Sequence, residues 1–502
     1  MYFIKDNFNH QPPQHLTTFT DFVGEFVSYM SNRSSGACGL PNFLIYSFYF
    51  WKKDCENGYY PKSTEYYRDN EFQRIIFKLN QPYLRVNQSS FTNFTIFDRE
   101  YFEALFGDKT FPDGSYMIDF EEEFISYEKA FMKVVSKIRE TNMMTFPVLT
   151  FSLLRVDGKF IDEEFARFAV QHNMRWNDSN FYISEDVTSL SNCCRLVSDI
   201  NTPFFNSIGG TALEVGSIKV NTINLARIAY ETNTKEEYMK LLEEKTILCL
   251  QTLDVIRHII KRNIEKGLLP NYSCGALHLE SQYNTIGIIG IYEAIQKFGF
   301  TYKDEFSNTF YTDEGLQFAK DFMQKMIDVK TEFAKDKDYM INIEQIPGER
   351  AAAVLMQKDQ IFFPDEAYEL PLYGNQFIPL GVKTTLQEKV RVSAVLDAAC
   401  SGGSILHANV DAPIHDFDTA WRLINYIADS GVKYFALCVR ISTCKNNHAY
   451  YGSRCPICGE PTETTWQRIV GFLTPEKSYS KERKAEFALR DWFKINDMGE
   501  TF

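Results

Sequence analysis

The chain has 502 residues, of which 44% are hydrophobic and 24% charged, as in a globular protein with a large core. Its formal charge of -13 argues against a role in coating nucleic acids, because that role requires a basic surface. The sequence contains no uncharged apolar run long enough to span a membrane, and the first ten residues lack the apolar stretch of a secretion signal. The eleven cysteines are unevenly spaced, so we expect reduced thiols in the cytoplasm and no disulfide framework.

The first third of the chain combines helical and strand patterns. Residues 15–53 show helix-like apolar spacing interrupted by a glycine-rich turn at 34–39. Residues 120–142 predict one amphipathic helix, with acids early and bases late, as the helix dipole favours. Residues 144–154 are an apolar, β-rich run typical of a buried strand.

The central part of the chain continues this alternation. Residues 221–228 begin a strand-to-helix unit, and residues 235–266 predict a long helix that ends at Gly267. Strands that alternate with long helices favour an α/β architecture. A second compositional region begins near Gly431.

Two vicinal cysteines, Cys193 and Cys194, directly precede Arg195. Neighbouring cysteines rarely bond to each other, and a buried cysteine is commonly an inert packing residue. A guanidinium beside a thiol favours the thiolate, which is the reactive form. The segment therefore indicates either a reactive thiol or a packed loop.

Three glycine-rich segments could bring backbone N–H groups to a phosphate or substrate. They are residues 207–225, 284–293 and 400–404, and their candidate contact residues are Gly209, Gly210, Ser217, Asn221, Asn224, Gly402 and Gly403. The first segment fits neither a Walker A nor a G-x-G-x-x-G spacing. The glycines of 284–293 could instead permit close packing at a tight turn into a helix. His407, just after the third segment, is more typical of a hydrogen-bonded core histidine.

The C-terminal region contains a set of metal-ligand residues. Cys455-Pro-Ile-Cys458 has the spacing of a zinc knuckle, in which two thiolates turn onto one ion. Cys444 and His448 complete a Cys₃His set, which is typical of a structural zinc site. Cys438 is an alternative fourth ligand at a looser spacing. A redox-active thiol pair, unligated thiols or a nucleic-acid-binding zinc ribbon are the other interpretations.

Gly471 follows this set in the sequence Arg468-Ile-Val-Gly-Phe-Leu. Glycine alone can lose an α-hydrogen to give an unhindered planar radical that both flanking peptide groups stabilise. A metal-stapled loop that presents such a glycine suggests radical chemistry. A simple turn glycine is the alternative.

In this order, the segments resemble the large subunit of the anaerobic (class III) ribonucleoside-triphosphate reductases, from about Phe19 to the C-terminus. The matching segments are Cys-Cys-Arg-Leu at 193–196, Gly-Ser-Ile-Lys-Val-Asn-Thr-Ile-Asn-Leu-Ala-Arg-Ile at 216–228, residues 284–293, Ile-Pro-Gly-Glu at 346–349, Tyr-Gly-Asn-Gln-Phe-Ile-Pro at 373–379, the zinc knuckle, and Arg-Ile-Val-Gly-Phe-Leu-Thr-Pro at 468–475. Together these motifs are highly specific.

The resemblance implies a ten-stranded α/β barrel over residues 1–430, with a finger loop near 190–216 inside it. It implies a small zinc-binding glycyl-radical domain over residues 431–502. The radical would reside on Gly471 and pass to a thiyl on Cys194, with Cys193 as the alternative. Arg195 and the glycine- and amide-rich segments would contact the substrate.

The resemblance also implies the reaction and its partners. The reaction is the anaerobic reduction of ribonucleoside triphosphates to 2′-deoxyribonucleoside triphosphates for DNA synthesis. A radical-SAM activase, with S-adenosylmethionine and a 4Fe–4S cluster, would generate the glycyl radical, and formate or a thioredoxin-like protein would supply electrons. We expect a cytoplasmic homodimer with ATP or dNTP effectors and a structural Zn²⁺ ion, without membrane or nucleic-acid partners.

The N-terminus departs from the family pattern. Full-length members begin with an ATP cone and a further segment that supplies the first barrel strand and, in many members, a second active-site cysteine. Only eighteen residues precede Phe19 here. We therefore expect no regulation by an ATP cone. We also expect an open barrel edge, and because an open edge favours association, a separate polypeptide could supply the missing strand.

Two alternative functions follow from the same features. The first is another glycyl-radical enzyme, of the pyruvate formate-lyase or diol-dehydratase kind, although the zinc knuckle directly before the glycine argues against it. The second is a catalytically inactive, truncated reductase chain that acts as a subunit or scaffold. This second alternative predicts zinc binding without radical formation.

Overall fold

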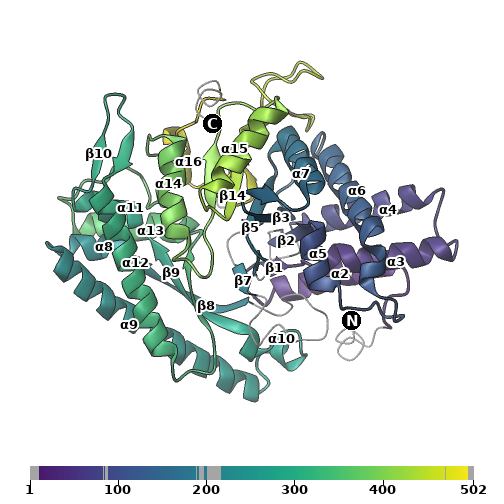
Figure 1. Ribbon diagram of the computed structural model, residues 1–502, viewed down its shortest axis with the longest axis horizontal. Coiled ribbons are helices and arrows are strands. Elements are labelled where there is room, and N and C mark those ends of the chain that lie inside the picture. Colours follow the sequence, from purple (N-terminus) through teal and green to yellow (C-terminus); the bar gives the residue numbers. More distant parts are fainter. Residues whose placement is uncertain are drawn as a thin grey trace.

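The computed structural model shows strands near the centre of the molecule and helices around them (Figure 1). The described residues are 11–34, 36–82, 84, 89–187, 216–469 and 471–495, together with the backbone of 189–191 and 197–199. In Figure 1 the N-terminal part lies on the right in purple and blue, and the central part lies on the left in teal and green. The direction of the strands divides the molecule into two halves, which meet at the antiparallel pair of β5 and β14.

The first half is a parallel sheet that follows the chain order. Its strands are β1 (Cys38–Gly39), β2 (Thr92–Phe97), β3 (Val148–Val156) and β5 (Ser179–Ser184), and each pairs in parallel with the next. Its helices are α2 (Leu16–Ser31), α3 (Phe43–Glu56), α4 (Thr64–Leu79), α5 (Arg99–Phe106), α6 (Glu121–Arg139) and α7 (Glu163–Trp176). Its short elements are η1 (Met117–Phe120), β4 (Lys159–Phe160), β6 (Ser189–Ser191) and β7 (Val197–Asp199).

The second half is also parallel. Its strands are β8 (Gly216–Asn224), β9 (Gln282–Ile289), β12 (Ile341–Gln345), β13 (Leu406–Asn409) and β14 (Tyr434–Cys438). Its helices are α8 (Leu225–Tyr230), α9 (Lys235–Glu265), α11 (Ile291–Lys297), α12 (Asp313–Ala334), α13 (Glu349–Phe362), α14 (Leu386–Asp397) and α15 (Phe417–Asp429). Its short elements are α10 (Pro270–Ser273), η3 (Leu279–Ser281), β10 (Thr301–Lys303) and β11 (Thr309–Tyr311).

The two halves meet where β14 pairs antiparallel with β5, with Tyr434 opposite Tyr182. A backbone bridge between Glu344 and Gly403 joins β12 to the segment that precedes β13. Among the described residues, nine strands thus follow one another from β1 to β8, and none of the pairings joins β1 to β8. Two parallel halves that run in opposite directions therefore form the wall of a barrel.

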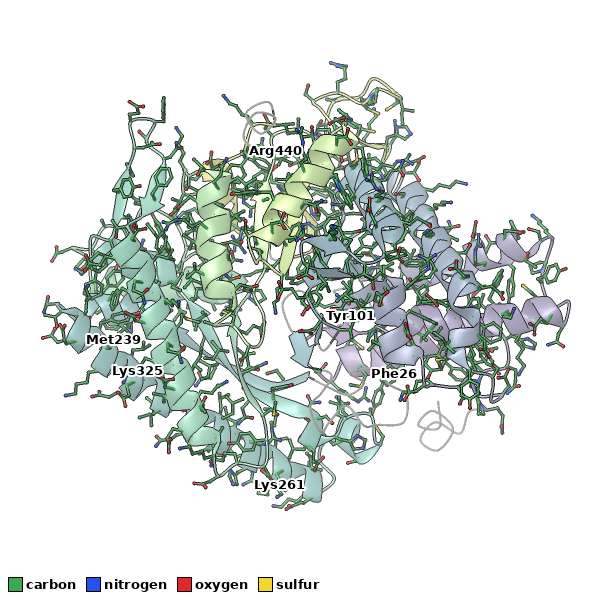
Figure 2. The ribbon with its side chains drawn as sticks, in the orientation of Figure 1. Phe26, Tyr101, Met239, Lys261, Lys325 and Arg440 are labelled. Atoms are coloured by element: carbon green, nitrogen blue, oxygen red, sulfur yellow. The ribbon has the colours of Figure 1, made fainter. Side chains whose placement is uncertain are left out.

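Alternation along the strands gives the wall an apolar outer face and a polar inner face. The rings of Phe151 on β3 and Phe181 on β5 lie 6.0 Å apart, and Phe151 also contacts Phe165 of α7. On the opposite face of the same strands, Asn180 donates to the Tyr434 hydroxyl at 2.8 Å, and Thr150 contacts that hydroxyl at 3.1 Å. The barrel interior is therefore lined with hydrogen-bonding groups. Figure 2 shows how densely side chains fill the space between strands and helices.

Three of the predicted elements are confirmed, and one is refined. The helix expected at 120–142 is α6, the long helix expected at 235–266 is α9, and the buried strand expected at 144–154 is β3. The predicted turn at 34–39 ends in strand β1, because Cys38 pairs with Thr92 of β2. No helix in the described ranges is both long and apolar enough to cross a bilayer.

A four-stranded antiparallel sheet follows the barrel strands in the chain. Its strands are β15 (Ile441–Thr443), β16 (Ala449–Tyr450), β17 (Thr464–Arg468) and β18 (Leu473–Pro475), and η4 (Glu476–Ser478) and α16 (Lys481–Leu489) follow. The chain then returns to the barrel, where Phe493 donates its backbone N–H to Asn409 at 2.9 Å. Strand β14 lies beyond the expected boundary near residue 430 but pairs with barrel strands. The separate sheet therefore begins at Ile441.

A buried ion pair joins α6 to the start of β5. Arg139 donates to Asp178 at 2.6 Å, and both residues are at most 3% exposed. Burial alone would raise the pKa of Asp178, but the charge of Arg139 and the hydrogen bond from His172 hold that pKa well below its usual range. The carboxylate is thus ionised in the folded state, and its stabilising effect is lost only at acidic pH.

We predict that Asp178→Asn lowers the free energy of unfolding by about 3 kcal/mol at neutral pH, because it leaves Arg139 buried without a counter-charge. Urea denaturation measures this change. The difference from wild type should shrink as pH falls below the usual pKa of aspartate, about 4. The exposed pair Arg175–Glu140 provides the control, and Glu140→Gln should change stability by less than about 0.5 kcal/mol. Equal effects of the two substitutions would contradict the prediction.

Candidate functional site

Gly471 lies in the turn of the hairpin that β17 and β18 form. Arg468 pairs with Leu473, so Gly471 lies between the paired ends of the two strands. Gly471 is buried, and its φ of 135° lies in a region that residues with a side chain rarely adopt. The backbone therefore requires glycine here whatever its chemistry.

The hairpin turn packs against the first half of the barrel. The ring of Phe472 lies 5.7 Å from that of Phe91, just before β2, and 5.4 Å from that of Phe146, just before β3. On the side of the second half, Gln467 contacts the side chain of Asn409 at 3.5 Å. The turn that carries Gly471 thus lies against segments that precede β2 and β3, while β17 contacts β13.

The four predicted metal ligands come together at the other end of the same small sheet. The ligand atoms of Cys444, His448, Cys455 and Cys458 all lie within 4.8 Å of one another. The Cys444 sulfur lies 3.7 Å from the Cys458 sulfur and 3.7 Å from Nδ1 of His448, which is 3.6 Å from the Cys455 sulfur. Tetrahedral zinc bonds of about 2.3 Å to sulfur and about 2.0 Å to nitrogen place neighbouring ligand atoms about 3.5 to 3.8 Å apart. The set therefore fits one tetrahedral ion.

The loops that carry these ligands are shaped by local hydrogen bonds. Gly459, with a φ of 71°, donates its N–H to the Cys455 carbonyl at 2.9 Å, which closes the knuckle turn. Hydrogen bonds from the backbone N–H of Glu460 and from the Asn446 side chain lower the pKa of the Cys458 thiol to about 6. A lowered pKa favours the thiolate, which is the form that binds a metal.

Cys438, the alternative ligand, lies elsewhere. It is on barrel strand β14, opposite Asn409 in the register of β13, and its thiol contacts the Ala436 carbonyl at 3.6 Å. Burial raises the pKa of Cys438 to about 11, so the thiol is protonated at neutral pH. It does not belong to the four-residue cluster.

Strand β8 carries three of the predicted substrate residues in different surroundings. The Ser217 hydroxyl lies 2.7 Å from that of Thr285 on β9. Asn221 pairs with Ile286, which belongs to the apolar core under the helices. Asn224 caps α8 and donates to Asp359 at 2.7 Å, so its side chain is already engaged.

Gly402 and Gly403 lie against β12. A β-carbon on Gly402 would come within 2.8 Å of the Asn342 side chain, so the close approach requires glycine. Gly403 has a φ of 103° and bridges to Glu344. Cys193, Cys194, Arg195, Gly209 and Gly210 lie outside the described residues.

A small pocket of about 190 Å³ opens at the carboxyl ends of β9 and β12. Gly290, Gln345, Gly374, Asn375 and Gln376 are among its lining residues. In α/β proteins, ligands bind at the carboxyl ends of parallel strands. Sequence reasoning singled out the segments 284–293 and 373–379 but named none of these residues as a candidate contact. Their glycine and amide content is the signal that could have found them.

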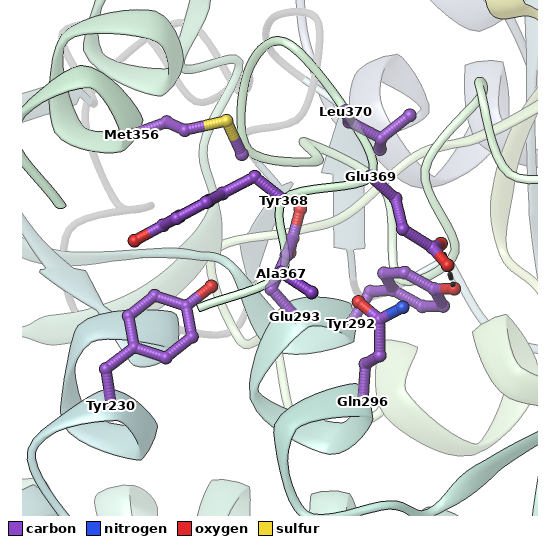
Figure 3. Close-up of a pocket in the computed structure, with 9 residues that line it drawn as sticks. All are labelled: Tyr230, Tyr292, Glu293, Gln296, Met356, Ala367, Tyr368, Glu369 and Leu370. Atoms are coloured by element: carbon purple, nitrogen blue, oxygen red, sulfur yellow. Dashed lines mark hydrogen bonds between the residues drawn. The ribbon is translucent and has the colours of Figure 1, made fainter. Parts of the chain in front are cut away.

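Glu293 lines a second pocket and is hydrogen-bonded to Gly374, which lines the first. One oxygen of its carboxyl group accepts the Gly374 N–H at 2.9 Å, and burial raises its pKa to about 7. The second pocket, of about 230 Å³, is lined by Glu293 together with Tyr230, Tyr292, Tyr368 and other residues (Figure 3). The residues predicted as site residues do not line this pocket.

Comparison with known proteins assigns the chain to a family. The family model described as anaerobic ribonucleoside-triphosphate reductase matches residues 3–493. Searching the curated proteins gives no match.

Solved structures agree with this assignment. A structure described as anaerobic ribonucleotide reductase is 40% identical, covers 97% of this chain and 77% of its own, and superposes with a TM-score of 0.90. The anaerobic ribonucleotide reductase from Thermotoga maritima in complex with dATP and CTP is 40% identical, with 95% and 78% coverage and a TM-score of 0.87. The same enzyme with dATP bound in the specificity site gives 40% identity, 94% and 78% coverage and a TM-score of 0.86.

The barrel of two opposed parallel halves and the C-terminal cysteine cluster thus accompany a family match over nearly the whole sequence. The chain belongs to the anaerobic ribonucleoside-triphosphate reductases, the oxidoreductases that convert ribonucleoside triphosphates to 2′-deoxyribonucleoside triphosphates.

Proposed function

We propose that Gly471 carries the glycyl radical of this reductase. The observation that carries the proposal is the position of Gly471, buried in a hairpin turn that packs against the first barrel half and adjoins the second. Burial protects a carbon radical from solvent and oxidants, and the absence of a side chain leaves the α-carbon free to become planar. The surrounding aromatic rings support the turn without supplying a competing polar group.

The four-residue cluster would hold a structural Zn²⁺ ion. Three thiolates and one imidazole fill a tetrahedral ion and leave no open position, so the ion would stabilise the fold and take no part in the reaction. Thr443 and Thr464 pair between β15 and β17, next to the ligands, and Gly471 follows the far end of β17. The ion would therefore fix the strand that presents the glycine.

The proposed reaction begins with hydrogen transfer from the Cys194 thiol to the Gly471 radical. Cys193 is the alternative donor. The thiyl then takes the 3′-hydrogen of the ribose, and the 2′-hydroxyl leaves as water after it gains a proton. Two electrons and a proton from formate or from a thioredoxin-like dithiol reduce the sugar, and return of the hydrogen to C3′ regenerates the thiyl.

The substrate would bind on the inner face, between the finger loop and the second half. Of the candidate contacts on β8, we favour Ser217, because Asn221 faces the helices and Asn224 is already engaged. The backbone of Gly402 and Gly403 and the loop residues Arg195, Gly209 and Gly210 complete the proposed set. The pocket at the ends of β9 and β12 is the described cavity nearest to this role.

Partners and regulation are proposed from the family. A radical-SAM activase with S-adenosylmethionine and a 4Fe–4S cluster would form the Gly471 radical. Nucleotide effectors such as ATP or dNTPs would act on a homodimer, as the dATP in the specificity site of the Thermotoga maritima enzyme suggests. We place the protein in the cytoplasm and treat the sheet from Ile441 onward as the radical domain within the predicted 431–502.

We predict that purified protein contains about one zinc ion per chain and that His448→Ala loses most of it, because three ligands no longer close the site. Elemental analysis by mass spectrometry measures the metal. Cys438→Ser is the matched control and should retain full zinc content, since that thiol lies on β14. Loss of zinc in Cys438→Ser together with its retention in His448→Ala would show that Cys438, and not His448, is the fourth ligand.

We predict that anaerobic incubation with a class III activase, S-adenosylmethionine and reductant produces an EPR doublet near the free-electron g-value. Gly471→Ala should abolish the doublet while zinc content stays unchanged, which shows that the strained backbone is still folded. An absent doublet in the zinc-loaded wild type would favour the inactive-chain alternative.

We predict that Cys194→Ala keeps the doublet but forms no deoxynucleotide, because the radical is made and cannot reach the ribose. Chromatography of the nucleotide products measures turnover. Cys193→Ala is the neighbouring control and should retain activity. Residual turnover in Cys194→Ala together with its loss in Cys193→Ala would assign the thiyl to Cys193.

A further inference from the structure

We propose that Arg468 is a positioning residue that directs its positive charge at the Gly471 carbonyl and thereby stabilises the radical. The inference rests on the proposed function, because it presupposes that Gly471 is the radical residue. It adds a component of the radical site that belongs neither to the metal cluster nor to the cysteines.

The geometry is that of a short, charge-assisted hydrogen bond. Arg468 is the last residue of β17 and is only 1% exposed. Its Nη1 donates to the Gly471 carbonyl at 2.6 Å, and its Nη2 donates to the Asn177 carbonyl at 3.1 Å. Hydrogen bonds from a charged donor are shorter and stronger than neutral ones. The guanidinium thus holds the hairpin turn on one side and the start of β5 on the other.

Among the described residues, Arg468 has no carboxylate partner of its own, because Asp178, whose charge acts on it, is already paired with Arg139. In the described part of the chain, no carboxylate oxygen lies within 4.0 Å of its guanidinium. Two other buried arginines in the region are paired, Arg139 with Asp178 at 2.6 Å and Arg490 with Glu486 at 3.0 Å. Burial lowers the pKa of Arg468, as expected for a cation removed from water. The positive charge is therefore available to the two carbonyls that it contacts.

Burying such a charge is unfavourable, which indicates that it has a use at this place. The nearby Cys438 does not supply a counter-charge, because burial raises the pKa of its thiol to about 11. The Arg468 Nε has no hydrogen-bond partner among the described residues. The buried positive charge thus has few partners to offset its loss of hydration. Its shortest hydrogen bond is to Gly471, the proposed radical residue.

The contact favours the radical over the closed-shell glycine for an electronic reason. In a glycyl radical the unpaired electron is shared between the amide nitrogen, the α-carbon and the carbonyl, so electron density increases on the carbonyl oxygen. A positive donor fixed in a low-dielectric interior stabilises that added density without reorganisation. Arg468 would therefore lower the energy needed to remove the Gly471 hydrogen and would lengthen the life of the resting radical.

A purely structural role for Arg468 makes a different prediction. If the guanidinium only shapes the turn, its removal changes radical yield or folding but not the electronic structure of the radical that forms. The largest component of the radical g-tensor distinguishes the two roles, because a hydrogen bond to a spin-bearing carbonyl oxygen lowers it. High-field EPR on the full-length chain after activation measures this component directly.

The experiment compares wild type with Arg468→Lys and Arg468→Gln, and uses Arg490→Gln as the matched control. Arg490 is a buried arginine of the same region that donates to the Arg468 carbonyl and not to Gly471. We expect Arg468→Gln to raise the largest g-component and to shorten the half-life of the radical at least several-fold. The g-component and half-life of Arg468→Lys should lie between those of Arg468→Gln and wild type. The Arg490→Gln spectrum should equal that of wild type. Zinc content verifies folding in each variant.

A measurement without substitution keeps the inference testable if the variants do not fold. Wild-type protein labelled with ¹⁵N-arginine should show a ¹⁵N hyperfine coupling to the radical in electron–nuclear double resonance. Absence of that coupling, or unchanged g-components and half-life in both folded Arg468 variants, would overturn the inference. Absence of any doublet in wild type would instead refute the assignment of the radical to Gly471, so the two failures are distinguishable.

Discussion

The antiparallel contact between β14 and β5 is the constraint on which the rest of the molecule depends. It joins two parallel halves that run in opposite directions, and the Tyr434 hydroxyl secures it from the inner face through Asn180 and Thr150. Strand β14 leads directly into the small C-terminal sheet, so the position of this contact also determines where that sheet begins. Beyond that sheet, Phe472 of the hairpin turn packs on Phe146, just before β3.

Two sets of buried charged side chains lie next to this contact, and they differ in how the charge is paired. Arg139 and Asp178 neutralise each other and fix the start of β5. Asn177, one residue earlier, accepts a hydrogen bond from Arg468 at 3.1 Å, and Arg468 in turn reaches Gly471. The Arg139–Asp178 pair thus fixes the start of β5, and Arg468 donates a hydrogen bond to the Gly471 carbonyl. A shift of β5 would be transmitted to Arg468 and the Gly471 turn through the Asn177 carbonyl.

Local spacing carried much of what could be predicted from the sequence. The knuckle spacing placed Cys455 and Cys458 with Cys444, and periodicity located α6 and α9, because metal turns and helices are built from neighbouring residues. Contacts between distant segments could not be predicted in this way. The proposed role of Arg468 depends on its hydrogen bonds to Gly471 and to the distant Asn177. The engagement of Asn224 depends on Asp359, which is 135 residues away. The short β1 was hidden in a glycine-rich turn, since two residues are too few to show alternation.

The backbone of Gly471 has a consequence for how this site changes over time. Its φ of 135° strains any residue with a side chain, quite apart from the proposed requirement for a planar carbon radical. Even a descendant that had lost the proposed radical chemistry would still favour glycine at this position because of the shape of the hairpin. Glycine would therefore be retained at position 471 after the proposed chemistry was lost, whereas the cysteine proposed as the thiyl residue would be free to change.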